Sequence, residues 1–147
     1  IPQSKNELSL SLEQYRFIDN DFKISAYCAI NPSEDIDKIR TAVSNVLIDM
    51  DEKIVGNSLI ANSNNYESLS KIYEIIRVKN IKKAYRRNLR QNIVDDSTWF
   101  YLNKQAAFAN VIALCDEDNQ SPLGPIKIVL QSKNIRDVID WFVPYEE

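Results

Sequence analysis

The sequence contains no histidine, only two glycines and only two cysteines among its 147 residues, and each shortage excludes a class of function. Without histidine there can be no Ser-His-Asp or Cys-His catalysis and no metal site that depends on an imidazole. Gly56 and Gly124 are too few and too far apart to form a GxGxxG or GxxxxGK(S/T) phosphate loop. We therefore expect no cofactor and no catalytic reaction.

The two cysteines, Cys28 and Cys115, lie far apart in the chain, each inside an apolar run. This placement indicates buried free thiols, because a disulfide framework needs more cysteines and a zinc site needs more ligands. No stretch approaches the ~18 uninterrupted apolar residues of a membrane span. Residues 1–12 also lack the continuous apolar core of a signal peptide. We expect a cytoplasmic protein with no membrane partner.

The charge of the chain is unevenly distributed. The net charge is −3, yet residues 71–90 carry eight lysines and arginines against a single acid, Glu74. That segment therefore has a net charge of +7, and the remainder of the chain has −10. Such asymmetry can create a local positive field on an acidic body.

The first half of the chain alternates between strand and helix patterns. Apolar and polar residues alternate over 22–30, which predicts a strand. Helical spacing predicts a helix over about 34–48, with Ser33 as its N-cap. A second strand is expected over 54–61, with Gly56 at a bulge.

Two sets of apolar residues then follow at helical spacing. The first is Leu69, Ile72, Tyr73 and Ile76, and the second is Ile81, Ala84, Tyr85 and Leu89. On one continuous helix the two faces would differ in direction by roughly 150°. One straight helix could not bury both against a sheet, so we expect a break near 78–80, with Asn80 capping a new helix. The two helices are expected over about 66–77 and 81–91.

The last part of the chain is expected to hold three strands and one helix. The strands are 98–103, an almost wholly apolar central strand over 106–115, and 126–131; the helix begins after Asn134. This order, β-α-β-α-α-β-β-β-α, predicts the α+β class, with helices packed on one face of a mainly antiparallel sheet. Residues 1–21 are interpreted as an N-terminal extension and 22–147 as a single α+β domain.

Six cations near the middle of the chain are spaced as one face of a helix. They fall at i, i+3, i+4, i+7, i+8 and i+11, within about 140° of arc and opposite the second apolar set. Such a row suits phosphates, because their neutralisation releases counterions and arginine offers a bidentate fork. A solvated helix face and an acidic protein partner are the alternatives. The six are Lys79, Lys82, Lys83, Arg86, Arg87 and Arg90.

Three further features of the sequence could carry a function. Trp99 and Tyr101 share one face of a predicted strand, where exposed rings could stack bases, although aromatic residues usually fill cores. Asn103, Lys104 and Gln105 could contact RNA bases, ribose or phosphate, or could form a turn with Asn103 in the left-handed conformation. The acidic run 116–118 does not fit the EF-hand spacing, and we expect a solvated loop without a metal.

Three segments resemble an uncharacterised archaeal protein family. They read WFYLNKQAA over 99–107, SPLGPI over 121–126 and VIDW over 138–141, and the basic helix precedes the first, as in the family. The resemblance covers roughly residues 22–144. It implies a fold similar to that of ribosomal protein L-five and RNA binding, and it carries over no catalytic residue.

The sequence thus leads to the hypothesis of a non-catalytic RNA-binding protein. The basic helix would bind RNA, and residues 103–105 would contribute. The alternative is a homodimeric structural or protein-interaction module that uses its apolar sheet surface and residues 1–20. A third possibility is an enzyme that works through carboxylates and Lys104.

Overall fold

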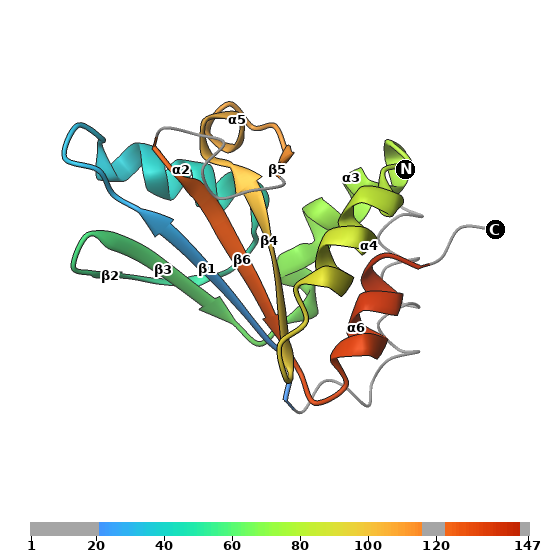
Figure 1. Ribbon diagram of the computed structural model, residues 1–147. Helices are drawn as coiled ribbons and strands as arrows, with labels where there is room; N and C mark the ends of the chain where they lie inside the picture. The colour runs from blue at the N-terminus through green and yellow to red at the C-terminus, as the bar shows by residue number, and fades with distance from the viewer. Residues whose placement is uncertain (1–20, 116–122, 145–147) are drawn as a thin grey trace.

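The computed structural model describes residues 21–115 and 123–144, and its centre is a six-stranded antiparallel sheet (Figure 1). The expected extension at 1–21, except Asp21, and the acidic run 116–118 lie outside the described residues. The strands follow the spatial order β2-β3-β1-β6-β4-β5. Their bounds are β1 (Lys23–Ala29), β2 (Asp51–Val55), β3 (Ser58–Ser63), β4 (Ser97–Asn103), β5 (Leu114–Cys115) and β6 (Pro125–Gln131).

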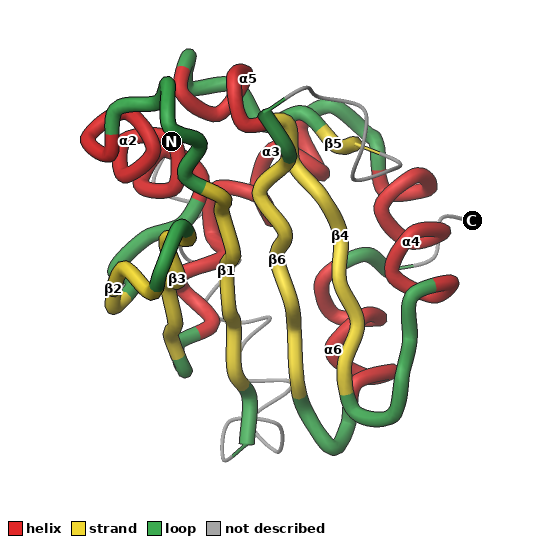
Figure 2. Tube along the Cα trace, turned by 60° about the vertical axis from the view of Figure 1, so that its left-hand side comes forward, coloured by secondary structure: helices red, strands yellow, loops and turns green. Residues whose placement is uncertain are grey.

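The helices all pack against the same face of this sheet. They are α2 (Ile36–Val46), the 3-10 helix η2 (Tyr66–Leu69), α3 (Ser70–Val78), α4 (Lys82–Gln91), α5 (Lys104–Phe108) and α6 (Ile135–Phe142). Alternate residues of the central strands, such as Ile24, Phe100 and Ile128, are completely buried under them. Figure 2 shows α4 beside β4, at one side of the sheet. The structure confirms the α+β class and the mainly antiparallel sheet.

The second predicted strand proves to be a hairpin. The chain pairs β2 with β3 through a two-residue turn at Gly56 and Asn57, and Val55 lies opposite Ser58. Gly56 has a φ of +59°, a left-handed conformation that glycine adopts without steric cost. The expected bulge at Gly56 was therefore wrong, because the same glycine reverses the chain.

The predicted central strand over 106–115 was also wrong. Asn103 caps the short helix α5 there, with its Oδ1 accepting a hydrogen bond from the backbone N–H of Ala106 at 2.8 Å. Ala107 is completely buried, which accounts for part of the apolar pattern. Within residues 106–115 only Leu114 and Cys115 pair with β4, and β6, on the other edge of β4, takes the central position.

The predicted break between the two middle helices is confirmed. Asn80 has a φ of +55°. The N–H of Ile81 donates to the carbonyl of Ile76 at 3.1 Å, and the N–H of Asn80 donates to the carbonyl of Arg77 at 3.3 Å. These two bonds form a Schellman motif that ends α3. Asn80 thus closes the preceding helix, whereas the sequence suggested that it capped the following one.

The predicted N-cap of α2 is displaced by two residues. Asp35, not Ser33, is the cap, and its Oδ1 accepts a hydrogen bond from the N–H of Asp37 at 3.0 Å.

Candidate nucleic-acid interface

Helix α4 fixes the direction in which the predicted cations project. Tyr85 and Leu89 are completely buried, and the ring of Tyr85 packs edge-on against Phe100 of β4, with 5.6 Å between centroids. Thr98 also donates its hydroxyl to the carbonyl of Leu89. Because one face of α4 is held against the sheet, the opposite face points to solvent.

Five of the six predicted cations are exposed or half-buried, and four of these five belong to α4. Lys79, at the end of α3, and Lys83, Arg87 and Arg90 of α4 are exposed, whereas Lys82 is half-buried. Within residues 21–115 and 123–144, the four other than Arg90 make no salt bridge of 4.0 Å or less. We call these five residues the α4 cation surface: Lys79, Lys82, Lys83, Arg87 and Arg90.

Arg86, the sixth, does not belong to that surface. Its side chain is buried, its Nη1 donates to the carbonyl of Val143, and its Nη2 lies 2.8 Å from Oδ1 of Asp140. Arg86 follows Tyr85 directly and so lies at the border of the packed face. The expectation that Arg86 contacts RNA is therefore corrected: its charge is neutralised at the end of α6.

Arg77 of α3 has a similar structural role. Its guanidinium donates to the carbonyls of Phe142 and Trp141, each at 3.1 Å, and lies 3.3 Å from the centroid of the Tyr73 ring. Burial lowers the pKa of Arg77, and the contact with Tyr73 only partly opposes this. Arg77 and Arg86 thus bind the C-terminal carbonyls of α6, where the helix dipole favours cations.

Lys104, which directly follows the end of β4, is buried as well. Its Nζ lies 2.9 Å from the carbonyl oxygen of Ala29, 2.7 Å from that of Leu123 and 3.0 Å from Oε1 of Glu34. These oxygens occupy the donors of the ammonium, so Lys104 connects β1, the start of α2 and the chain before β6. Its expected contact with phosphate is corrected.

The neighbours of Lys104 differ from it in exposure. Asn103 is the cap of α5, in extended conformation with a φ of −68°, and only Gln105 of the three is exposed. Figures 1 and 2 both show α5 beside α2, with β5 between α5 and α4. The predicted residues 103–105 therefore do not extend the α4 cation surface.

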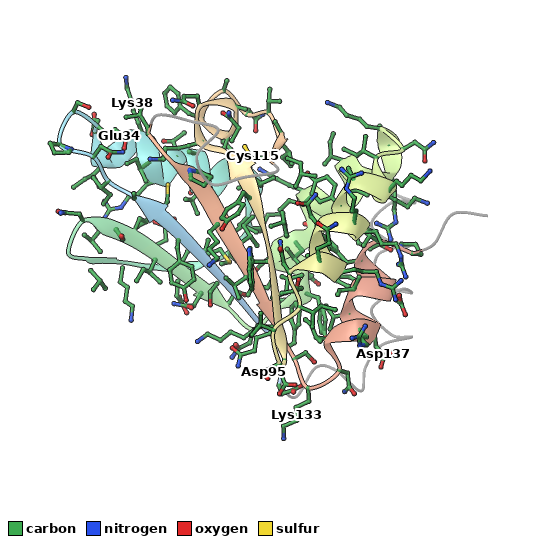
Figure 3. All side chains as sticks on the ribbon, viewed as in Figure 1. Glu34, Lys38, Asp95, Cys115, Lys133 and Asp137 are labelled. Carbon is green, nitrogen blue, oxygen red and sulfur yellow. The ribbon has the colours of Figure 1, made fainter. Side chains whose placement is uncertain are left out.

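A pocket of about 380 Å³ lies beside the buried ion pair. Figure 3 shows Glu34 and Lys38, two of its lining residues, at the start of α2. Burial tends to raise the pKa of Glu34, but hydrogen bonds from Asn31 and Lys104 outweigh it and lower the pKa overall. The Glu34 carboxylate is held ionised, so it does not provide a general acid. The Lys104 ammonium is already bonded to oxygens, so it does not provide a free nucleophile.

The face of the sheet opposite the helices carries the aromatic pair that the sequence singled out. Trp99 and Tyr101 are half-buried on this open face. The residues that alternate with them in β4, Phe100 and Leu102, are completely buried under the helices. Nζ of Lys127 on β6 lies 4.8 Å from the centroid of the Trp99 ring. The alternation within β4 was enough to predict that Trp99 and Tyr101 share a face, but not that this face is open.

Two further residues of the open face were missed from the sequence. Tyr27 of β1 is 42% exposed. Tyr27 pairs with Lys127, which in turn pairs with Tyr101. The alternation in β1 and β6 could have placed each residue on a face, but the pairing of strands remote in sequence could not be read from it.

The part of the chain that the structure describes contains no group of three or more possible metal-ligating residues. Among the same residues, no helix is long and apolar enough to cross a membrane.

The chain is similar to several archaeal proteins. A family model described as RNA binding matches residues 23–132. The UPF0201 protein of Metallosphaera sedula is 35% identical over 125 residues, covering 83% of this chain and 87% of its own. That of Sulfolobus acidocaldarius is 35% identical over 126 residues, with the same coverage of both chains.

Solved structures agree with these matches. A crystal structure of an uncharacterised UPF0201 protein is similar at a TM-score of 0.71 and 25% identity, covering 84% of this chain and 94% of the other. The UPF0201 protein of Methanococcus jannaschii shares the fold at a TM-score of 0.72 and 22% identity, covering 85% and 95% of the two chains. With a family model over most of its length and relatives that align along more than four-fifths of it, the chain belongs to the archaeal UPF0201 family.

Proposed function

We propose that this protein binds RNA through the α4 cation surface and catalyses no reaction. The observation that carries the proposal is a helix whose inner face is anchored on the sheet and whose outer face presents cations. The description of the matching family model as RNA binding supports the nature of the ligand.

The chemistry of the surface favours the backbone of the RNA over its bases. Lysine and arginine bind phosphate oxygens, and such contacts position a nucleic acid without reading its sequence. From Lys82 to Arg90 the helix rises about 12 Å, so the row is long enough to meet more than one phosphate. We therefore expect recognition directed by the shape of the RNA.

The test is the salt dependence of RNA affinity after two exposed cations are removed. The double variant Lys83→Gln/Arg87→Gln should bind RNA more weakly, because two phosphate contacts are lost. The slope of log affinity against log salt should become shallower by about 1.5, since each contact contributes about 0.7–0.9. Filter binding with structured RNA at several salt concentrations measures both quantities.

A matched control removes two other exposed lysines. Figure 3 shows Lys38 near the start of α2 and Lys133 at the lower end of the sheet, both away from α4. The variant Lys38→Gln/Lys133→Gln loses the same charge and should keep the salt slope of the unmodified protein. Equal slopes for all three proteins would contradict the proposal.

One observation favours a second candidate, a homodimeric module without a nucleic-acid role. A pocket of about 360 Å³ between α3 and the loop after α5 is lined by Ile75, Val78 and Val111, and Val78 is 80% exposed. Apolar side chains gathered in a hollow can accept a second copy of the chain. A dimer that light scattering detects and that Val78→Asp separates would support this function, and a monomer at every concentration would contradict it.

A further inference from the structure

The open face of the sheet presents three aromatic rings in a compact arrangement. Tyr27, Lys127 and Tyr101 lie in one row across β1, β6 and β4. With strands 4.7–4.9 Å apart, the two tyrosines are separated by about 10 Å. Trp99 lies two residues from Tyr101 on the same strand, hence about 7 Å along it. We call Tyr27, Trp99, Tyr101 and Lys127 the sheet platform.

The core does not account for these rings. The buried layer is formed by the alternate residues of the same strands, such as Phe100 and Ile128, which are completely buried. Among the described residues, no helix or strand lies over the opposite face, as Figure 2 shows for the central strands. Tyr27 and Trp99 remain partly exposed on this face, where a ligand with flat rings can reach them.

The charge around the platform suits a nucleic-acid strand. By the alternation of their strands, Lys23, Lys53 and Lys127 share the open face, against one acid, Asp51. Any of the four bases can stack on an aromatic ring, and nearby lysines can bind the phosphates that join the bases. Single-stranded RNA offers both groups at once, because its bases are not paired with one another.

The contact between Lys127 and Trp99 is compatible with such a ligand. An exposed cation–π contact is worth only about 0.5–1 kcal/mol. A phosphate that draws the Lys127 ammonium toward itself would therefore uncover the indole ring at little cost. The lysine side chain would exchange one partner for another, and a base would take its place on the ring.

The platform and α4 lie on opposite sides of β4, so an RNA that meets both must pass around this side of the sheet. The side-chain amide of Asn92, at the end of α4, donates to the carbonyl of Trp99 at 2.8 Å. We propose that the sheet platform stacks the unpaired bases of single-stranded RNA, while the α4 cation surface binds the backbone of the same molecule. This inference rests on the proposed function and specifies its ligand as RNA with an unpaired segment.

Tryptophan fluorescence offers a direct test. The chain contains two tryptophans, and Trp141 is buried at 2% exposure, so quenching by a bound base reports on Trp99. We expect an oligo(U) strand of about ten nucleotides to quench the fluorescence of the unmodified protein. A short RNA duplex should bind without quenching, because its bases are already stacked.

Affinity measurements on two variants complete the test. Tyr27→Ala and Trp99→Ala should each weaken binding of oligo(U) by about 5- to 150-fold, the loss expected for one stacked base. Their affinity for the duplex should stay within about twofold. The α4 double variant Lys83→Gln/Arg87→Gln should weaken binding of both RNAs. Circular dichroism checks that each variant is folded, and Tyr27→Ala, at an exposed position, remains informative if Trp99→Ala does not fold.

The possible failures can be told apart. If oligo(U) binds but neither quenches Trp99 nor responds to Tyr27→Ala, while Lys83→Gln/Arg87→Gln weakens its binding, the platform is wrong and RNA binding through α4 stands. If neither RNA binds, both proposals are wrong. If Tyr27→Ala changes the oligomeric state and leaves oligo(U) affinity intact, the platform is an interface between copies of the chain and the inference is overturned.

Discussion

Arg86 and Arg87 are adjacent in the sequence but have opposite surroundings. Arg86 is buried and bonded to Val143 and Asp140, whereas Arg87 is exposed on the outer side of α4. The salt bridge with Asp140 is not the main contribution, because that carboxylate is 48% exposed and water can replace the guanidinium. The carbonyl of Val143, at the end of α6, depends on Arg86 more strongly.

This pair of arginines gives the first prediction. Arg86→Ala should lower the free energy of unfolding by about 1–3 kcal/mol, because it leaves a buried carbonyl without a donor. Arg87→Ala should change stability by no more than about 0.5 kcal/mol and should weaken RNA binding. Urea denaturation and filter binding on both variants measure these effects. Equal stability losses would contradict the assigned roles.

A second prediction concerns Glu34 and pH. Hydrogen bonds from Asn31 and Lys104 hold the pKa of Glu34 below its ordinary value of 4.5 despite burial. The unfolded state therefore binds a proton more readily, and the folded state is favoured as long as Glu34 is ionised. This contribution is complete above the ordinary pKa and is lost as the pH falls through the lower pKa of the folded state.

The Glu34→Gln variant isolates that contribution. It should be less stable than the unmodified protein near neutral pH, and the difference should shrink as the pH falls below about 4.5. Urea denaturation across a pH series measures the difference. The control is Glu67→Gln, an exposed acid of η2, which should show no comparable convergence. A stability difference independent of pH would contradict the ion pair.

At the scale of elements, the boundary between α3 and α4 decides the position of the basic surface. Asn80 adopts a φ of +55° and ends α3 in a Schellman motif, after which α4 starts in a new direction. The two apolar faces can therefore both meet the core, and Ile76 and Leu89 are completely buried. The cations of α4 then point outward because the opposite face of the same helix is anchored.

The third prediction tests this boundary. A β-branched residue strongly disfavours the left-handed conformation, so Asn80→Val should lower the free energy of unfolding by about 1–2 kcal/mol. Asn80→Gly, the matched control, adopts that conformation freely and should be as stable as the unmodified protein or slightly more so. Urea denaturation compares the two. Similar stabilities of the valine and glycine variants would show that the conformation does not matter.

At the scale of the whole molecule, the two cysteines report on the opening of the core. Both are buried and form no disulfide, as their apolar surroundings in the sequence predicted. Burial raises the pKa of the Cys28 thiol to about 11, so that at pH 8 only about one thousandth of it is ionised. Cys28 also lies on β1, in the middle of the sheet.

The fourth prediction is that the Cys28 thiol resists alkylation until the protein unfolds. Iodoacetamide at pH 8 should modify Cys28 slowly in the native state and rapidly in urea, with a midpoint that follows the unfolding transition. Mass spectrometry of labelled peptides identifies the site. Rapid labelling of Cys28 under native conditions would mean that the sheet opens locally and that the two transitions are separate.

Most elements could be predicted from local patterns. The alternation in β1 and the helical spacing in α4 depend on neighbours along the chain, so each revealed its buried face. The pattern failed over 106–115, where α5 packs its alanines against α2 and leaves a long apolar stretch that resembles a strand. It also missed the turn at Gly56, because a short hairpin and a bulged strand have similar sequences.

The candidate site was predictable in outline only. The helical spacing and the absence of acids identified a basic face, and the sequence alone predicted six cations on one side of one helix. Five of them are exposed or half-buried, and Lys79 lies at the end of α3, outside α4. Only the tertiary structure decided that Arg86 and Lys104 serve the fold, because their partners Asp140 and Glu34 are 54 and 70 residues away in the chain. It also decided that Trp99 and Tyr101 lie on the uncovered face. Periodicity assigns residues to a face, but the packing of remote elements determines which face is buried.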